Sequence, residues 1–445
     1  MFLWKKAVKV LRVGSFRGSN KSVMEDKYAD WSKEQLIERL LELETSEPAG
    51  GQKPSPSAST LPNKVKPPKK AKASRKFDFS KYDRRFIALK FAYLGWNYNG
   101  LAIQKEPTPQ PTIEGVIIEA LNKCKLVPST EPQTFHFSRC GRTDKGVSAM
   151  NQVISLYVRS NLNPEEQLDP QNDPREIPYV NILNQLLPDD IRISAVCLRP
   201  PKGFDARFSC QYRHYRYLFH KEGLDIQRMG EAASLFLGEH DFRNFCKLDG
   251  SKQITNYRRT IMSAKILPIS DDFYCFDLIG SAFLWHQVRC MMANLFLVGQ
   301  NLEEVSLISD MLDVEKTPRK PIYDMASEVP LILYDCKFPN MEWIETNLDD
   351  YKAIKYGKAI GALTLGYQLK AEIAQIFKEV LPSSSANLAG KTTINLGNGK
   401  GKVITKYEKM SRRNVMEAPE TVNEKFKQRK RFKNEAKRTD AVSSS

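Results

Sequence analysis

Residues 138–149 read Ser138-Arg139-Cys140-Gly141-Arg142-Thr143-Asp144-Lys145-Gly146-Val147-Ser148-Ala149. Apolar and polar residues alternate before this stretch, at residues 135–137, and after it, at 152–158. The alternation predicts two strands joined by a loop, which places the loop on a rigid base. Gly141 and Gly146 bracket Asp144, so the backbone can turn sharply on both sides of one carboxylate.

The role of Asp144 has two interpretations. A single aspartate between glycines usually closes a turn and takes no part in chemistry. However, the order Gly-Arg-Thr-Asp-Lys-Gly-Val-Ser-Ala between two predicted strands resembles the catalytic loop of the tRNA pseudouridine synthases of the TruA family. Many members carry His where this chain has Ser148, whereas the eukaryotic branch that modifies the anticodon stem-loop tolerates Ser. The resemblance implies that Asp144 is the catalytic carboxylate and that tRNA uridines 38 and 39 are the targets.

Other stretches carry the same resemblance. They are the aromatic, glycine-rich loop at 93–100, the capped helix at 112–121, the turn and strand at 187–193, the Phe-x-Ala-Arg-x-Ser motif at 204–209 and the strand at 330–334. The resemblance implies substrate-binding roles for Arg207 in the motif, for Leu333 beside the site and for Tyr215, which would pack against the target base. The spacing alone also fits a plain core strand, since Tyr215, Tyr217 and Phe219 share one face.

Two arginines complete the predicted site. Arg289 lies in an apolar run that predicts a helix through Gly299, and a buried arginine needs a carboxylate partner. By resemblance to the family, that partner is Asp144, whose charged form a nearby cation favours. Arg142 lies two residues before Asp144, so in an extended loop both side chains leave the same side. We expect Arg142 to fill the space that the flipped base vacates or to bind a phosphate.

Signatures of metal and cofactor binding are missing from the sequence. The eight cysteines contain no C-x-x-C pair and the five histidines no i, i+4 pair, which argues against a zinc site. The scattered cysteines also indicate a reduced, intracellular protein. There is no zinc-deaminase signature and no G-x-G-rich dinucleotide turn. No apolar run approaches the roughly 20 residues of a membrane span. We therefore expect no metal, no cofactor and no membrane.

Charge is concentrated at the two ends of the chain. Residues 1–80 contain 17 Lys or Arg and 9 Asp or Glu, and residues 400–445 contain 14 and 6, so each end has a net charge of +8. The total is +16, and the middle is therefore neutral. Basic ends on a neutral body favour attraction to nucleic-acid phosphates, although solubilising or targeting tails have the same composition. We expect tRNA, through its anticodon stem-loop, to be the partner.

The patterns together predict an α+β protein with four parts. These are a basic extension at 1–80 with a helix at about 31–45 and a disordered linker, an N-terminal catalytic lobe at 84–198 carrying Asp144, a C-terminal catalytic lobe at 199–345 carrying Tyr215 and Arg289, and a helical extension with a basic tail at 346–445. The family resemblance implies two RNA-binding-like, ferredoxin-like lobes. They would form one continuous mixed or antiparallel sheet, flanked by helices, with the active-site cleft between them. It also implies a homodimer.

We therefore expect an isomerase that converts uridine to pseudouridine in tRNA. The main alternative is a non-catalytic tRNA- or RNA-binding protein on the same fold, because basic tails and aromatic strands also serve binding alone. The two basic arms favour the nucleus and the cytoplasm. Residues 1–24 contain no acidic residue and resemble a mitochondrial transit peptide, but a disordered basic arm fits them equally well.

Overall fold

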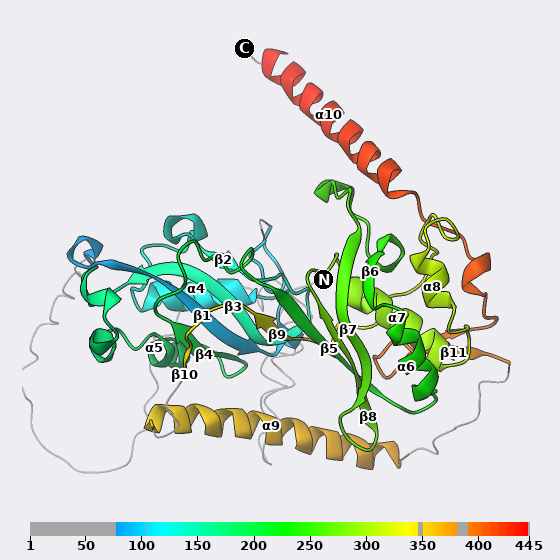
Figure 1. Ribbon diagram of the computed structural model, residues 1–445, viewed down its shortest axis with the longest axis horizontal. Coiled ribbons are helices and arrows are strands. Elements are labelled where there is room, and N and C mark those ends of the chain that lie inside the picture. Colours follow the sequence, from blue (N-terminus) through cyan, green and yellow to red (C-terminus); the bar gives the residue numbers. More distant parts are fainter. Residues whose placement is uncertain (1–76, 105, 346–349, 381–389, 444–445) are drawn as a thin grey trace, which may run out of the picture. The chain divides into compact units, whose positions relative to one another are not determined.

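One ten-stranded sheet organises the part of the chain that the structure describes (Figure 1). The structure is a computed structural model and describes residues 77–345 except 105, residues 350–380 and residues 390–443. The expected helix at 31–45 and the transit-like segment at 1–24 lie outside these ranges. The strands of the sheet are β1 (Arg84–Tyr93), β2 (Ser138–Arg139), β3 (Ser148–Arg159), β4 (Ile191–Cys197), β5 (Tyr212–His220), β6 (Gly238–Asp241), β7 (Arg258–Pro268), β8 (Phe273–Gly280), β9 (Leu331–Lys337) and β10 (Ile344–Glu345).

The two halves of the sequence meet in the middle of this sheet. The strand order is β10-β4-β1-β3-β9-β5-β8-β7-β6, with β2 beside β3. All described neighbours pair antiparallel except β3 and β9, which pair in parallel where Ala149 faces Leu333. Since β9 also pairs with β5, it joins the strands of both halves. The predicted α+β class with a continuous mixed sheet is confirmed, while the domain boundaries stay predictions.

Helices cover each half of the sheet. They are α4 (Ile113–Lys123), α5 (Tyr179–Leu186), α6 (Ile226–Ser234), α7 (Gln287–Gly299) and α8 (Leu307–Leu312). One buried core gathers residues of α4, α5, β1 and β3, and a second gathers residues of α6, α7, β5 and β8 (Figure 1). As predicted, Thr112 caps α4 by accepting the Gly115 N–H at 3.2 Å. Every residue of α7 except Arg289 is buried, so this helix packs against the protein on nearly all of its sides.

The strand expected before the Asp144 loop is shorter than predicted. Residues Pro132–Phe135 form a 3₁₀ turn, and β2 contains only Ser138 and Arg139. Pro132 has no N–H to donate to a sheet, and His136 has a left-handed backbone with φ of 51°, which interrupts strand pairing. The apolar residues at 135 and 137 therefore do not indicate a strand here.

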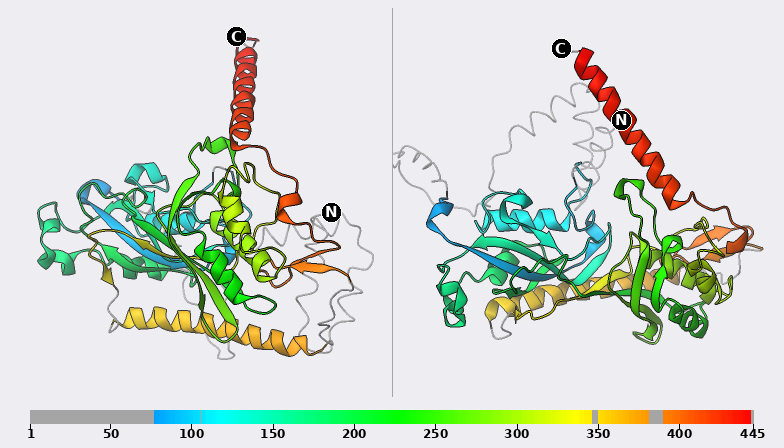
Figure 2. Two further views of the ribbon diagram at one scale, coloured as in Figure 1. Left: turned by 45° about the vertical axis from the view of Figure 1, so that its right-hand side comes forward. Right: turned by 45° about the horizontal axis from the view of Figure 1, so that its top comes forward.

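The C-terminal part adds two long helices and a hairpin (Figure 2). The helices are α9 (Tyr351–Lys378) and α10 (Pro419–Ser443), and the hairpin strands are β11 (Thr392–Ile394) and β12 (Lys402–Ile404). The helix α9 lies in the part of the chain for which a helical extension was predicted, and none of its residues is buried. Of the helices that the structure describes, none is both long enough and apolar enough to cross a membrane.

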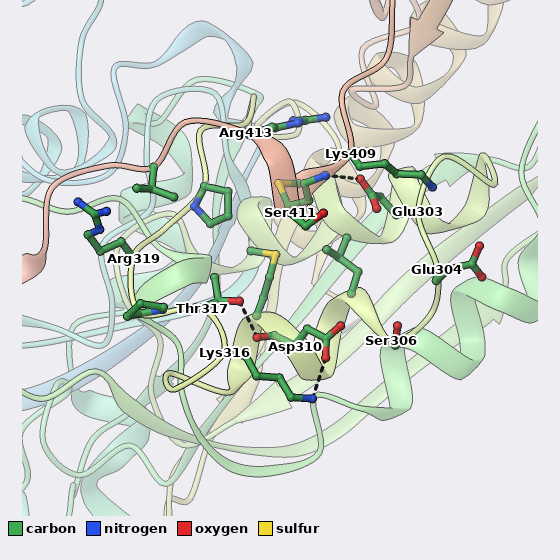
Figure 3. Close-up of a pocket in the computed structure, with 16 residues that line it drawn as sticks. Glu303, Glu304, Ser306, Asp310, Lys316, Thr317, Arg319, Lys409, Ser411 and Arg413 are labelled. Carbon is green, nitrogen blue, oxygen red and sulfur yellow. Dashed lines mark hydrogen bonds and ion pairs between the residues drawn. The ribbon is translucent and has the colours of Figure 1, made fainter.

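A buried glutamate fastens the chain after the hairpin to the second half. Glu303, 6% exposed, accepts hydrogen bonds from the Tyr407 hydroxyl at 2.7 Å and from the Met410 N–H at 2.6 Å. Figure 3 shows Glu303 beside this segment, at the edge of a pocket of about 500 Å³ that it shares with the chain around α8. These contacts make residues 407–410 part of the second core, where Met410 is buried.

Candidate active site

The loop that carries Asp144 connects β2 to β3, and a buried glutamine fixes its start. Gln152 on β3 is fully buried. Its side-chain N–H donates to the Gly141 carbonyl at 3.2 Å, and its Oε1 accepts the Gly141 N–H at 3.4 Å. This one side chain satisfies the backbone groups that have lost their sheet partner after β2.

The segment after β1 holds the end of the same loop. The Gly95 N–H donates to the Ser148 hydroxyl at 3.0 Å, and the Leu101 N–H donates to the Thr143 carbonyl at 3.1 Å. The approach is so close that a Cβ on Gly95 would lie 2.0 Å from the Val147 carbonyl oxygen. Only glycine fits at residue 95, and Ser148 has a structural role as the hydrogen-bond acceptor there.

Two side chains from the other half of the sequence hold the Asp144 carboxylate. The indole N–H of Trp285 donates to Oδ1 at 3.2 Å, and Nε2 of His286 lies 3.2 Å from Oδ2. The Asp144 side chain keeps 33% of its surface exposed. The carboxylate is thus oriented by its neighbours and still open to a substrate.

The predicted pairing of Arg289 with Asp144 is wrong. Arg289 is partly buried and has a carboxylate partner, as predicted, but that partner is Glu328, with Nη2 to Oε2 at 2.9 Å. Its Nε also donates to the Ala326 carbonyl at 2.7 Å. The chain before β9 therefore satisfies the guanidinium, while Trp285 and the histidine beside it satisfy Asp144. Glu328 also packs on the Asp144 loop, since its Cγ lies 2.8 Å from the Cβ position of Gly146.

A cleft of about 810 Å³ opens over the Asp144 loop. Its lining includes Arg142, Asp144, Arg207, Tyr215 and Arg289. Five of the six residues predicted from the sequence are thus brought together. A volume of this size is enough for a nucleoside with its neighbouring phosphates.

The sixth predicted residue, Leu333, does not line the cleft. It is fully buried on β9, where it pairs with Ala149 on one side and Tyr215 on the other. Leu331, two residues earlier, lines the cleft instead. Leu333 belongs to the core of the first half, and its expected contact with substrate is corrected to a packing role.

The ring of Tyr215 forms part of the cleft wall. The ring meets that of Phe283 edge to face, with centroids 4.9 Å apart. Burial raises the pKa of the Tyr215 hydroxyl above its usual value of about 10. The hydroxyl is therefore protonated at neutral pH, and the ring offers a rigid apolar face.

The arginines at the cleft differ in how they are held. Arg142 and Arg207 are exposed, so both guanidinium groups are accessible to phosphate. Arg213, which the sequence interpretation missed, instead donates to the carbonyls of Cys140 at 3.0 Å and Arg207 at 3.1 Å. Arg213 thereby connects the start of the Asp144 loop to the turn that carries Arg207.

Sequence interpretation also missed Trp285, His286 and Glu328. Trp285 and His286 directly precede α7, and that position beside Arg289 was the only available signal. No spacing rule connects them with residue 144. In the described ranges, no group of three or more His, Cys, Asp or Glu side chains is arranged to hold a metal ion.

Comparisons with known proteins agree with this geometry. A family model described as tRNA pseudouridine synthase matches residues 232–339. A Saccharomyces cerevisiae protein named tRNA pseudouridine(38/39) synthase is 63% identical over 92% of this chain and 93% of its own length. The Homo sapiens protein of the same name is 46% identical over 61% of this chain and 60% of its own length. A Methanosphaera stadtmanae tRNA pseudouridine synthase A is 31% identical over 62% of this chain and 92% of its own length. With a carboxylate, an aromatic ring and arginines in one cleft, and with these relatives, the chain belongs to the family of tRNA pseudouridine synthases.

Proposed function

We propose that this chain converts uridine to pseudouridine at positions 38 and 39 in the anticodon stem-loop of tRNA, with Asp144 as the catalytic carboxylate. The observation that supports this most is the partly exposed carboxylate of Asp144, held by Trp285 and His286 in the cleft that Tyr215 lines. The yeast relative that is 63% identical carries the name of this activity.

The reaction is an isomerisation. The N1–C1′ bond of uridine breaks, the uracil turns, and a C5–C1′ bond forms, so the substrate neither gains nor loses electrons and no redox cofactor is needed. The protein has to hold the base outside its stack and supply an ionised carboxylate in a site shielded from water. In this proposal, Asp144 supplies the carboxylate. Tyr215 stacks on the uracil, which is worth about 1–3 kcal/mol, and Arg142 and Arg207 bind phosphate or fill the vacated space.

A basic helix anchored at the cleft supports tRNA as the partner. The first two turns of α10 pack on residues 249–254, whose Asp249 and Lys252 line the cleft. Asn423 of α10 is 9% exposed and donates to the Ile254 carbonyl at 2.8 Å. Beyond this anchor the helix exposes the basic side chains Lys425, Lys427, Arg429, Lys430, Arg431 and Lys433. Such a run attracts phosphates next to the reaction site.

The test is a tRNA pseudouridylation assay, mapped by nucleotide position, with unmodified tRNA that has uridine at 38 and 39. Wild type should form pseudouridine at these positions. Asp144→Asn should lower the rate by a factor of about 10³ or more while binding tRNA normally. Asp249→Asn removes another carboxylate from the same cleft and should retain activity. Normal turnover of Asp144→Asn contradicts the proposed mechanism, and tRNA binding without any product by wild type favours the binding-protein alternative.

A second part of the proposal is that the protein is a homodimer joined through α9. Five apolar side chains on one side of this helix are more than half exposed: Leu365 54%, Leu369 55%, Ile373 65%, Ile376 65% and Phe377 72%. Spacings of three and four residues put them on one face. The helix is attached to the body on another side, where Tyr367 meets Trp96 edge to face at 5.2 Å. A second copy of the same stripe is the self-complementary surface that a twofold dimer needs.

Sedimentation or light scattering of the full chain tests the dimer. Leu369→Asp should shift the mass from dimer to monomer, because it places a charge in the apolar stripe. Gln375→Asp, on the same helix but outside the stripe, should leave the dimer intact. A wild-type monomer, or a dimer that survives Leu369→Asp, contradicts the role of α9.

We also propose that the protein works in the nucleus and the cytoplasm. The basic cluster at 64–76, outside the described residues, supports nuclear import. A fluorescent fusion of the full chain should be found in both compartments. Deleting residues 1–24 should leave that distribution unchanged, and loss of a mitochondrial signal on this deletion shows that these residues act as a transit peptide.

A further inference from the structure

The most exposed large apolar side chain among the described residues lies next to the active-site cleft. Phe208 has 79% of its surface exposed, and it directly follows Arg207, which lines the cleft. The two side chains contact each other, since Cζ of Arg207 lies 5.2 Å from the centroid of the Phe208 ring. The ring belongs to neither buried core. A single exposed apolar residue is common on protein surfaces, so its surroundings decide what it does.

The turn that carries Phe208 is held in one conformation. The Asp205 carboxylate accepts hydrogen bonds from the N–H groups of Arg207 at 2.8 Å and of Phe208 at 3.0 Å. On either side of Asp205, Phe204 and Ala206 are buried and anchor the turn in the first core. A ring that is fixed in this way loses little backbone entropy when a ligand packs on it.

The same turn is linked to the cationic part of the cleft. Arg213 donates to the Arg207 carbonyl at 3.1 Å and to the Cys140 carbonyl at 3.0 Å, which joins the turn to the start of the Asp144 loop. Arg142 and Arg207 are exposed, and both line the cleft with Asp144. An aromatic ring beside a guanidinium is a combination that binds single-stranded RNA, because the ring stacks on a base and the cation attracts a phosphate. The cations therefore favour a nucleotide over an apolar protein segment as the ligand of this ring.

We propose that Phe208 stacks on the unpaired base next to the target uridine and that Arg207 binds a phosphate of the same nucleotide. When the target base leaves its stack, the neighbouring base loses a stacking partner on one face. On the 5′ side of both proposed targets this neighbour lies in the anticodon loop, where bases are unpaired. The Phe208 ring covers the face that has been uncovered and so stabilises the open form of the loop. The inference deepens the proposed tRNA pseudouridylation and rests on it.

The first experiment changes the protein and compares the full-length wild type with Phe208→Ala, Phe208→Trp and Tyr351→Ala. Tyr351 is 77% exposed and does not line the cleft, so its variant controls for the loss of an exposed ring. Phe208→Ala should bind tRNA about tenfold more weakly and raise KM by the same factor. Its kcat and unfolding temperature should not change, because the stack is the same before and during the reaction. Phe208→Trp and Tyr351→Ala should match wild type.

The second experiment changes the RNA at the nucleotide on the 5′ side of the target uridine. An abasic nucleotide at this position should weaken binding to wild type about tenfold, and it should not weaken binding to Phe208→Ala any further. The fluorescent base 2-aminopurine, which is quenched when it stacks, is placed at the same position in a second RNA. Its fluorescence should be lower in the complex with wild type than in the complex with Phe208→Ala.

The inference is overturned if Phe208→Ala binds tRNA as tightly as wild type, or if Phe208→Trp binds as weakly as Phe208→Ala. It is also overturned if the abasic RNA loses the same affinity for both proteins, because the base is then bound elsewhere. The binding and fluorescence measurements need no product. A wild type that forms no pseudouridine therefore overturns the proposed function alone, and these measurements still decide whether Phe208 stacks on the RNA.

Discussion

The wall of the cleft at residues 140–147 is held by its backbone, whereas the wall at residues 283–289 is held by side chains. Main-chain groups of the first wall bond to the Gln152 side chain and to the main chain of Leu101 and Tyr98. In the second wall, Trp285 and His286 reach Asp144 across the cleft. Backbone contacts allow almost no added volume, while side chains can change rotamer. Adding even one methyl group to the first wall should therefore disturb the site. The second wall should be disturbed by substitutions that remove a hydrogen-bond or ion-pair partner.

Among changes that leave Asp144 in place, the largest effect is expected at residue 95. In Gly95→Ala, the new methyl group would lie 2.0 Å from the Val147 carbonyl oxygen, so the loop and the segment after β1 must separate. Overpacking of this kind costs about 1–3 kcal/mol of folding free energy, and displacement of Asp144 should lower turnover by about a factor of 100. Thermal unfolding and the tRNA assay measure both.

Gly141 in the same loop is the matched control for stability. No atom lies within 4 Å of its Cβ position, and its backbone is not left-handed. Gly141→Ala should unfold at nearly the wild-type temperature. If Gly95→Ala is as stable as Gly141→Ala, the loop is not held by close backbone approach, and the contrast between the two walls fails.

The same contrast explains what the sequence could predict. The first wall was found because its glycines and its carboxylate follow each other along the chain, where order and spacing are visible. The continuous sheet was implied by the family resemblance, whereas the helices α4 and α7 followed from apolar spacing and capping in the same way. These are local properties, which pattern reasoning captures.

The second wall depends on contacts between distant residues. The sequence indicated that Arg289 needed a carboxylate, and this physical requirement was met. It could not distinguish Asp144 from Glu328, because the choice is decided by how α7 and the chain before β9 pack. The prediction that Leu333 contacts substrate failed for the same reason, since its burial depends on how distant parts of the chain pack around β9. Nothing in the sequence around Trp285 and His286 indicated that their partner is Asp144.

The next effect should come from the Arg289–Glu328 pair, which connects the two walls. Glu328→Gln keeps the shape of the side chain that packs on Gly146 but removes the charge that holds Arg289. We expect turnover to fall roughly tenfold with little change in tRNA affinity, because Glu328 positions the loop and does not line the cleft. Asp324→Asn, which breaks an exposed pair with Lys402, is the control and should leave turnover unchanged. Equal turnover of the two variants would show that the walls are not coupled through Glu328.

A smaller effect is expected from α10, which is anchored at the residues next to the second wall. Replacing Lys425, Lys427, Lys430 and Lys433 by Gln should weaken tRNA binding several-fold and make it less dependent on salt, since fewer counterions are released. The rate at saturating tRNA should not change, because Asp144 and its neighbours are untouched. Binding curves at two or more salt concentrations measure the slope. An unchanged slope would show that these lysines do not contact phosphate.

The smallest effect is expected from removing the hydroxyl of Tyr215, whose ring lines the cleft. Burial raises the pKa of the hydroxyl above its usual value, so the group is protonated on both sides of neutral pH and cannot act as a base there. Tyr215→Phe should therefore change turnover by less than about threefold, and its rate profile between roughly pH 6 and pH 9 should match that of wild type. Tyr215→Ala removes the ring and should lose about 1–3 kcal/mol of stacking. If Tyr215→Phe is as slow as Tyr215→Ala, or if its pH profile shifts, the hydroxyl takes part in proton transfer and the ring is not the functional group.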